Sequence, residues 1–309
     1  MRLRGLSQAP VVVVGSPRSG TSWVMRTIAR QSRYCAIFEP LHPRWWPEAR
    51  AAGFGDRPWD GNARKRAYLR QVFRGLKARR STRRPRWSET VGANPRLLIR
   101  GAVKRLRARR LVVKFVRACR LLPWMVAEFP DCRYVYVVRN PYAVVNSQLS
   151  EGVSSYVDDR ATPFDFLNEA AQKGSGRERL CDRIRSDAAQ VLDETAVREI
   201  DSLEGCLALS WYADNLVAQR VAACTETVFT VNYEDLLTDT DTEMERIYAH
   251  VGAGAPPSTT ETVKNPERQL HKWKEQLSDR QVASIRETLR MLENRYEQVG
   301  SRCGGGYRR

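Results

Sequence analysis

A run of four valines followed at once by a glycine-bounded polar loop is the feature that most constrains this chain. Val11–Val14 is short, fully apolar and β-branched, which is typical of a strand buried on both faces of a parallel sheet. The loop 15–20 (GSPRSG) follows it, and a helical pattern then runs over 21–31. A strand, a loop and a helix in this order predict an α/β fold with an anion-binding loop at the end of the strand.

The remaining apolar segments alternate between strand-like and helical patterns. Further buried strands are predicted at 111–116, 134–138 and 228–231. Helices are predicted after Pro141, from a Ser278 cap over 278–299, and over 62–80, 96–110, 124–129, 203–224 and 239–251. We expect one domain over 1–309, with a central, mostly parallel sheet flanked by helices in three layers. A basic helical insertion at about 62–110 and a polar insertion at about 151–200, with some helix, would be added to it.

The net charge of +17 is concentrated in one part of the chain. Residues 64–120 hold 21 Lys or Arg and a single acidic residue, Glu89, so this block accounts for the whole excess. Trp87 is the only aromatic residue between Phe73 and Phe115, which disfavours base stacking and therefore nucleic-acid binding. We expect the block to face an anionic acceptor, although a membrane surface or a solvated helix pair would also explain its charge.

The cysteines and the hydropathy pattern bear on location. No segment has the length and apolarity of a signal sequence or a membrane span. Seven scattered cysteines without a C-x-x-C pair suit reduced thiols better than disulfides or a zinc site. We therefore expect a soluble cytoplasmic protein without a bound metal, and we leave a homodimer open.

The loop after the first predicted strand departs at one position from the phosphate-binding pattern of nucleoside triphosphatases. The loop Gly15–Thr21 nearly matches G-x-x-x-x-G-K-[ST], but Thr21 stands where that pattern needs Lys, and the cation comes earlier, as Arg18. The run P-R-S-G-T-S-W resembles the 5′-phosphosulfate loop of the sulfotransferase superfamily, whose members use 3′-phosphoadenosine 5′-phosphosulfate (PAPS). This resemblance implies a P-loop fold that sulfotransferases share with kinases. It also implies donor binding by Arg18, Ser19, Gly20, Thr21 and Ser22, with Trp23 near the adenine or packed beneath the loop.

Two later segments resemble the rest of that donor site. The run 134–147 (YVYVVRNPYAVVNS) is similar to the superfamily's 3′-phosphate motif, which implies that Arg139 and Ser147 hold the 3′-phosphate. The run 231–236 (VNYEDL) is similar to the Y-E-D-L segment, which implies that Tyr233 lies near the adenine; packing in the core is an equal alternative. All three segments follow predicted strands, where ligands of parallel sheets bind.

The general base is expected from a third resemblance. Glu39 lies in F-E-P-L-H-P, 21 positions after Arg18, and this segment is similar to carbohydrate sulfotransferases and to the spacing of the base in tyrosylprotein sulfotransferases. The resemblance implies that Glu39 takes the acceptor's proton, with His42 as the reserve candidate. Lys114, at the end of a predicted strand, would stabilise the bridging oxygen as its bond to sulfur breaks. The alternative for Glu39 is a structural salt bridge to Arg18 or Lys114.

The sequence therefore predicts an enzyme that transfers a sulfuryl group from PAPS to an acceptor hydroxyl, leaving 3′-phosphoadenosine 5′-phosphate (PAP). We expect the acceptor to be an anionic carbohydrate or glycosylated metabolite. Two alternatives stay open at this stage. One is a P-loop nucleotide kinase, which the missing loop Lys disfavours. The other is a non-enzymatic protein that binds polyanions or nucleic acid through the Arg-rich block 64–110.

Overall fold

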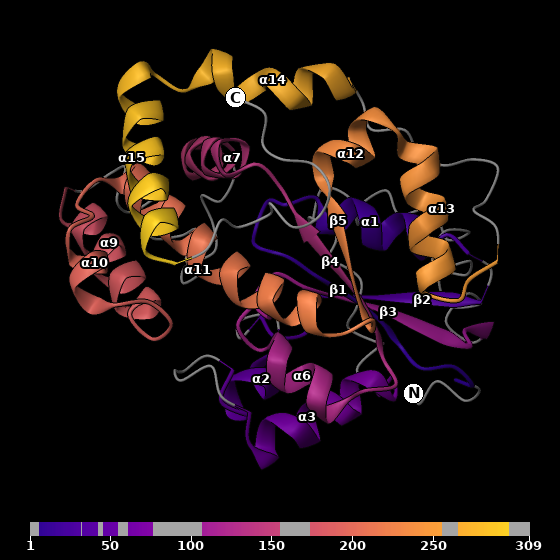
Figure 1. Ribbon diagram of the computed structural model, residues 1–309. Helices are drawn as coiled ribbons and strands as arrows, with labels where there is room; N and C mark the ends of the chain where they lie inside the picture. The colour runs from indigo at the N-terminus through magenta and orange to yellow at the C-terminus, as the bar shows by residue number, and fades with distance from the viewer. Residues whose placement is uncertain are drawn as a thin grey trace, which may run out of the picture.

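The computed structural model describes residues 6–31, 33–42, 46–54, 61–76, 107–154, 174–254 and 265–296. At its centre lies a sheet of five parallel strands in the order β2-β3-β1-β4-β5 (Figure 1). The strands are β1 Val11–Val14, β2 Tyr34–Phe38, β3 Arg110–Phe115, β4 Arg133–Val138 and β5 Val228–Asn232. Four of them are confirmed predictions. The sequence analysis does not predict β2, an edge strand of five residues.

Both faces of the sheet are covered by helices, as the valine run predicts. Val11 and Val13 pack into one core with α1 Thr21–Ile28, α12 Tyr233–Thr238 and α13 Thr240–His250. Val12 and Val14 pack into the opposite core. Because successive strand residues point to opposite faces, a four-valine strand with no exposed side chain requires both layers.

The second core is the larger one. Its helices are α2 Pro47–Ala51, α3 Ala63–Phe73, α6 Leu122–Glu128, α7 Pro141–Ser154, α9 Gly174–Ala188, α10 Glu194–Arg198, α11 Leu203–Cys224 and α15 Asp279–Arg295. Helix α14, Pro266–Gln276, packs against both α7 and α12 and so connects the two layers (Figure 1). The expected α/β fold with three layers is confirmed.

Side-chain caps define several helix starts. The Asn140 side chain accepts hydrogen bonds from the backbone N–H of Tyr142 and Ala143, at 2.9 and 3.3 Å, so the predicted start of α7 is confirmed. Ser278 forms a capping box with Gln281 at the start of α15.

The predicted basic helices are confirmed only in part. Helix α3 ends at Phe73, short of the predicted residue 80, because Gly75 takes the left-handed conformation with φ 70° that commonly ends helices. The helix predicted over 96–110 falls mostly outside the described residues, and Arg110 already belongs to β3.

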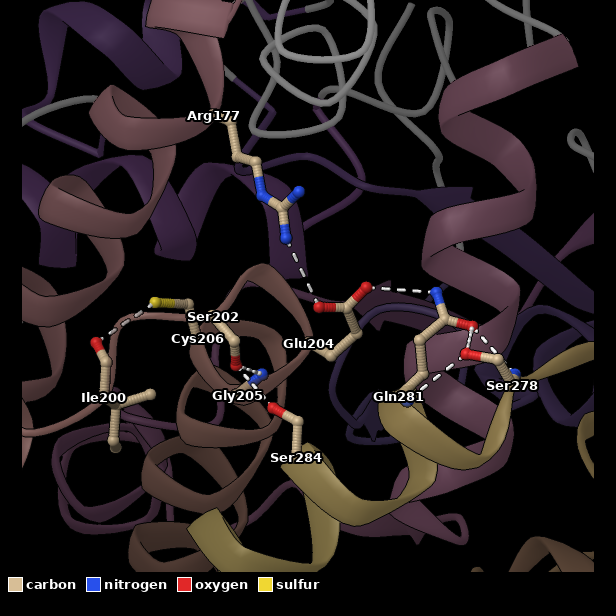
Figure 2. Close-up of polar contacts among 9 residues, drawn as sticks. All are labelled: Arg177, Ile200, Ser202, Glu204, Gly205, Cys206, Ser278, Gln281 and Ser284. Atoms are coloured by element: carbon tan, nitrogen blue, oxygen red, sulfur yellow. Dashed lines mark hydrogen bonds and ion pairs between the residues drawn. The ribbon is translucent and has the colours of Figure 1, made fainter.

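Polar contacts tie three of the outer helices together (Figure 2). Glu204 of α11 accepts a 3.0 Å hydrogen bond from Gln281 of α15 and forms a 3.5 Å ion pair with Arg177 of α9. Ser202 caps α11 by accepting from the backbone N–H of Gly205, at 3.0 Å. Where the structure describes the polar stretch 151–200, the chain is largely helical, in the end of α7 and in α9 and α10.

Over the described residues, no helix is both long and apolar enough to cross a lipid bilayer. Within the same ranges, no three His, Cys, Asp or Glu side chains gather in a way that could hold a metal ion. The cysteines found there are free thiols, and all but Cys224 are buried.

A buried ion pair joins the loop after β3 to α11. Arg120, whose side chain is 4% exposed, contacts Asp214 with 2.6 Å between Nε and Oδ1, and its Nη1 donates to the carbonyl of Asp187 at 2.6 Å. Burial raises the pKa of Asp214, and the positive charge of Arg120 opposes that rise. The side chain of Asp214 is 19% exposed, and Arg120 supplies the counter-charge beside it.

We expect Arg120→Met to lower the free energy of unfolding by about 2 kcal/mol, because it leaves Asp214, whose side chain is 19% exposed, without its counter-charge. The matched control is Arg198→Met, which removes an exposed pair with Glu194 within α10 and should cost under about 0.5 kcal/mol. Urea denaturation of both variants measures the difference. Equal losses would contradict a stabilising role for the buried pair.

Candidate active site

Four neighbouring strands, β2, β3, β1 and β4, end on the same side of the sheet, where the candidate residues lie. Phe38 of β2 and Val13 of β1 both pair with Lys114 of β3. Val13 also pairs with Val135 of β4. Because the strands are parallel and in this register, the loops after β1, β2 and β4 leave the sheet on the same side. The site is built from those loops.

The loop after β1 is held in a compact turn. Ser19 donates its backbone N–H to the carbonyl of Ser16 at 3.2 Å, and the two hydroxyl oxygens lie 2.7 Å apart. Arg18 and Gly20 both adopt positive φ, 74° and 89°. Helix α1 begins directly afterwards, so the positive end of its dipole faces the loop.

Two residues of the predicted 3′-phosphate motif meet this loop. Arg18 donates from Nε to the hydroxyl of Ser147 in α7, at 3.0 Å. Arg139, just past β4, donates from Nη1 to the backbone carbonyl of Arg18, at 3.0 Å. The structure thus brings together three predicted residues that are up to 129 positions apart in the sequence.

The guanidinium of Arg139 lies over an aromatic ring. Its central carbon is 4.7 Å from the centroid of the Tyr233 ring, a distance at which the ring quadrupole attracts a cation. Burial lowers the pKa of Arg139, while Tyr233 and the carboxylate of Glu234 raise it. Among the described residues, the Nε of Arg139 is one of three buried side-chain polar atoms without a hydrogen-bond partner. A buried donor of this kind suits an anion that approaches the group.

The predicted adenine neighbours, Tyr233 and Trp23, lie deeper than the loop surface. Tyr233 is 7% exposed and packs against Gly20, so that a Cβ atom on Gly20 would come within 2.2 Å of its ring. Trp23 is buried in the core with α1, beneath the loop. Thr21 is buried and Ser22 half-buried in the first turn of α1.

The predicted base and the predicted lysine form a buried ion pair. Glu39 and Lys114 are 3% and 5% exposed at their side chains, with 2.7 Å between Oε1 and Nζ. Both carboxylate oxygens also accept the backbone N–H of Val116, each at 3.1 Å. The ammonium of Lys114 lies 4.2 Å from the centroid of the Phe38 ring. Of the two partners considered for a salt bridge, Lys114 is the one that Glu39 contacts here.

The backbone at Glu39 is strained. Its φ of 46° lies in the left-handed region, which a side chain other than glycine seldom takes. Neighbouring contacts hold the turn. The backbone carbonyl of Glu39 accepts the backbone N–H of His42 at 3.0 Å, and Tyr68 of α3 donates its hydroxyl to the carbonyl of Pro40 at 2.6 Å. His42 itself is 6% exposed.

Three further residues contact the site that the sequence analysis does not single out. Gln148 points its amide Nε2 at the carbonyl of Pro17, at 3.5 Å. Glu234 accepts the backbone N–H of Asn140 at 3.0 Å, and Trp211 donates to the carbonyl of Arg139 at 3.1 Å. Gln148 and Glu234 adjoin predicted residues, which is a usable signal. Trp211 gives none, because it reads as an ordinary apolar position of a helix.

We expect Gly20→Ala to destabilise the chain more than Gly252→Ala. Both glycines have positive φ, but a Cβ at Gly252 meets nothing within 4 Å, whereas one at Gly20 strikes the Tyr233 ring. The excess loss should be about 1–3 kcal/mol in urea denaturation, the usual cost of overpacking. Equal losses for the two variants would mean that Tyr233 moves aside at little cost.

Several sulfotransferases are among the solved structures that resemble this chain. Mouse sulfotransferase SULT7A1, complexed with PAP, is 15% identical at a TM-score of 0.48, over 94% of this chain and 86% of that one. The sulfotransferase domain from the curacin biosynthetic pathway is also 15% identical, at a TM-score of 0.47 over 93% and 99%. STF9 from Mycobacterium avium is 14% identical, at 0.39 over 94% and 77%. No curated protein sequence matches the chain.

The sequence itself matches a family model over residues 10–193, which is more than half of the chain. That segment includes the loop after β1, the Glu39–Lys114 pair, Arg139 and Ser147. The chain belongs to the sulfotransferase family.

Proposed function

We propose that this sulfotransferase takes its sulfuryl group from PAPS and passes it to a hydroxyl of a carbohydrate or glycosylated metabolite. The observation that carries the proposal is the meeting of Arg18, Ser147 and Arg139 at the loop between β1 and α1. A donor with separate phosphate groups needs cations and hydroxyls at separate points, and these side chains come from three elements.

The residues present fit the donor. The partnerless buried Nε of Arg139 supports contact with an anion, and its planar guanidinium matches phosphate oxygens. Arg139 and Ser147 would hold the 3′-phosphate. The contact of the Tyr233 ring with Arg139 supports the proposal that Tyr233 lies near the adenine. The 5′-phosphosulfate end would be held by the loop residues Arg18, Ser19, Gly20, Thr21 and Ser22.

Glu39 is the proposed general base. The bound donor supplies an electrophilic sulfur, whose bond to the bridging oxygen of the 5′-phosphate breaks as the acceptor oxygen bonds to it. Glu39 would receive the acceptor's proton. Its ion pair and its contacts with Val116 keep the carboxylate oriented, and a carboxylate has about four lone-pair sites, so acceptor capacity remains on Oε2.

Lys114 is proposed to neutralise charge on the bridging oxygen. Its ammonium is already held between the Glu39 carboxylate and the Phe38 ring, so little reorganisation is needed. When Glu39 takes a proton, its attraction for Lys114 weakens, and the ammonium becomes free to follow the developing negative charge. The pair thus couples base and electrostatic stabiliser.

The acceptor assignment is supported by α3. Tyr68 ties this helix to the turn that carries Glu39, and Arg64, Arg66, Arg70 and Arg74 are exposed on its surface. Arg66 and Arg70 share the carboxylate of Glu128, at 2.6 and 3.2 Å. A cationic surface beside the base would attract an anionic acceptor. Most of the basic block, 77–106, lies outside the described residues.

Calorimetric titration with PAP tests the donor assignment. Wild type should bind PAP more tightly than 5′-AMP or ATP. Arg139→Ala should lose this preference, because the loss of one charge-assisted contact weakens PAP binding by about 10-fold or more. Preference for ATP would instead support a nucleotide kinase. Absence of any PAP binding would favour a polyanion-binding role for the basic block.

Glu39→Gln tests the base. We expect PAP affinity to be kept and turnover to fall by about 10²–10⁴-fold, the usual scale for loss of general acid–base catalysis. Transfer from radiolabelled PAPS to a panel of carbohydrate acceptors measures turnover. The matched control is Glu128→Gln, another ion-paired glutamate, which should retain activity. Full activity of Glu39→Gln would move the role to His42.

A further inference from the structure

The backbone carbonyl of Arg139 accepts a hydrogen bond from a buried indole of helix α11. Trp211 of α11 donates from Nε1 to this oxygen at 3.1 Å, and its side chain is 3% exposed in the core. Arg139 lies where the chain has left β4 and α7 begins at Pro141. The contact therefore fixes the backbone at the point where the chain turns away from the sheet.

Next to Trp211, helix α11 is tied to β4 by buried hydrogen bonds. One turn after Trp211, Asn215 donates its amide Nδ2 to the Trp211 carbonyl at 2.6 Å and accepts the hydroxyl of Tyr136 at 2.7 Å. Asn215 and Tyr136 are 0% and 1% exposed. Because buried hydrogen bonds of this kind are costly to break, α11 cannot slide along β4 without losing them.

The side chain of Arg139 is restrained at its other end. The Tyr233 ring lies at 4.7 Å, Nη1 donates to the Arg18 carbonyl, and the next residue's N–H is bound by Glu234. Among its buried polar atoms, Nε stays without a hydrogen-bond partner. The carbonyl anchor and the ring together hold the guanidinium with one buried donor available.

We infer that Trp211 is a positioning residue for Arg139, and that its indole N–H sets the preference of the site for nucleotides that carry a 3′-phosphate. The inference rests on the proposed donor. Trp211 touches no phosphate itself; it acts by holding the backbone from which the phosphate-binding guanidinium extends. Removing its N–H would let the Arg139 peptide rotate and the guanidinium tilt away from its ligand.

The test compares PAP with 5′-AMP, which lacks the 3′-phosphate, by calorimetric titration of the full chain. Trp211→Phe should weaken PAP binding about 10-fold and 5′-AMP binding less than about twofold, because only the 3′-phosphate contact depends on Arg139. The matched control is Tyr212→Phe, which removes a buried hydrogen bond from the next residue of the same helix to the carbonyl of Leu292 but leaves the Arg139 carbonyl anchored. It should keep the preference of wild type.

Replacement of the Trp211 indole by benzothiophene, using β-(3-benzothienyl)alanine, deletes the N–H without changing the ring shape. It should reproduce the Trp211→Phe result even if that variant folds poorly. Parallel weakening of PAP and 5′-AMP, or an unchanged preference, would overturn the role of Trp211. If wild type does not prefer PAP over 5′-AMP, the proposed donor assignment is wrong. The titration of wild type alone decides this, independently of the Trp211 variants.

Discussion

The position of β1 in the middle of a parallel sheet is the constraint on which the site depends. β1 pairs with β3 on one side and β4 on the other. Loops that follow these strands must therefore leave the same edge within a short distance of one another. A one-residue slip of β1 would turn each valine to the other face and would break the pairing with β3 and β4, so this pairing fixes where the strand ends. The loop after β1 therefore has a fixed starting point.

Local strain marks the two residues nearest the proposed chemistry. Arg18 and Glu39 both adopt left-handed backbone conformations, which cost about 1–3 kcal/mol each. Tertiary contacts compensate: the Arg139 guanidinium binds the carbonyl of Arg18, while the Glu39 side chain is bound by Lys114 and Val116. The strain persists only while those partners are in place, so the loop after β1 and the turn after β2 depend on neighbouring strands.

The sequence predicts the loops better than it predicts what supports them. Strands such as 11–14, and motif residues such as Arg18 and Ser147, have local signatures: apolar runs, glycine turns and a helix start. β2 escapes prediction because an apolar run of five residues cannot be told from a buried helical segment by periodicity. Trp211 escapes because its partner lies 72 positions away and no local pattern encodes the contact. The Glu39–Lys114 pair stands as one of two alternatives until the register of β2 and β3 sets them side by side.

The buried Glu39–Lys114 pair gives the proposed base a partner at a position that is almost closed to water. A buried charge is costly without a partner, and the Lys114 ammonium supplies one at 2.7 Å from Oε1. In the proposed reaction, negative charge grows on the leaving oxygen as the acceptor gives up its proton. In this proposal, Lys114 is bound to Glu39 before the reaction and to the leaving oxygen during it.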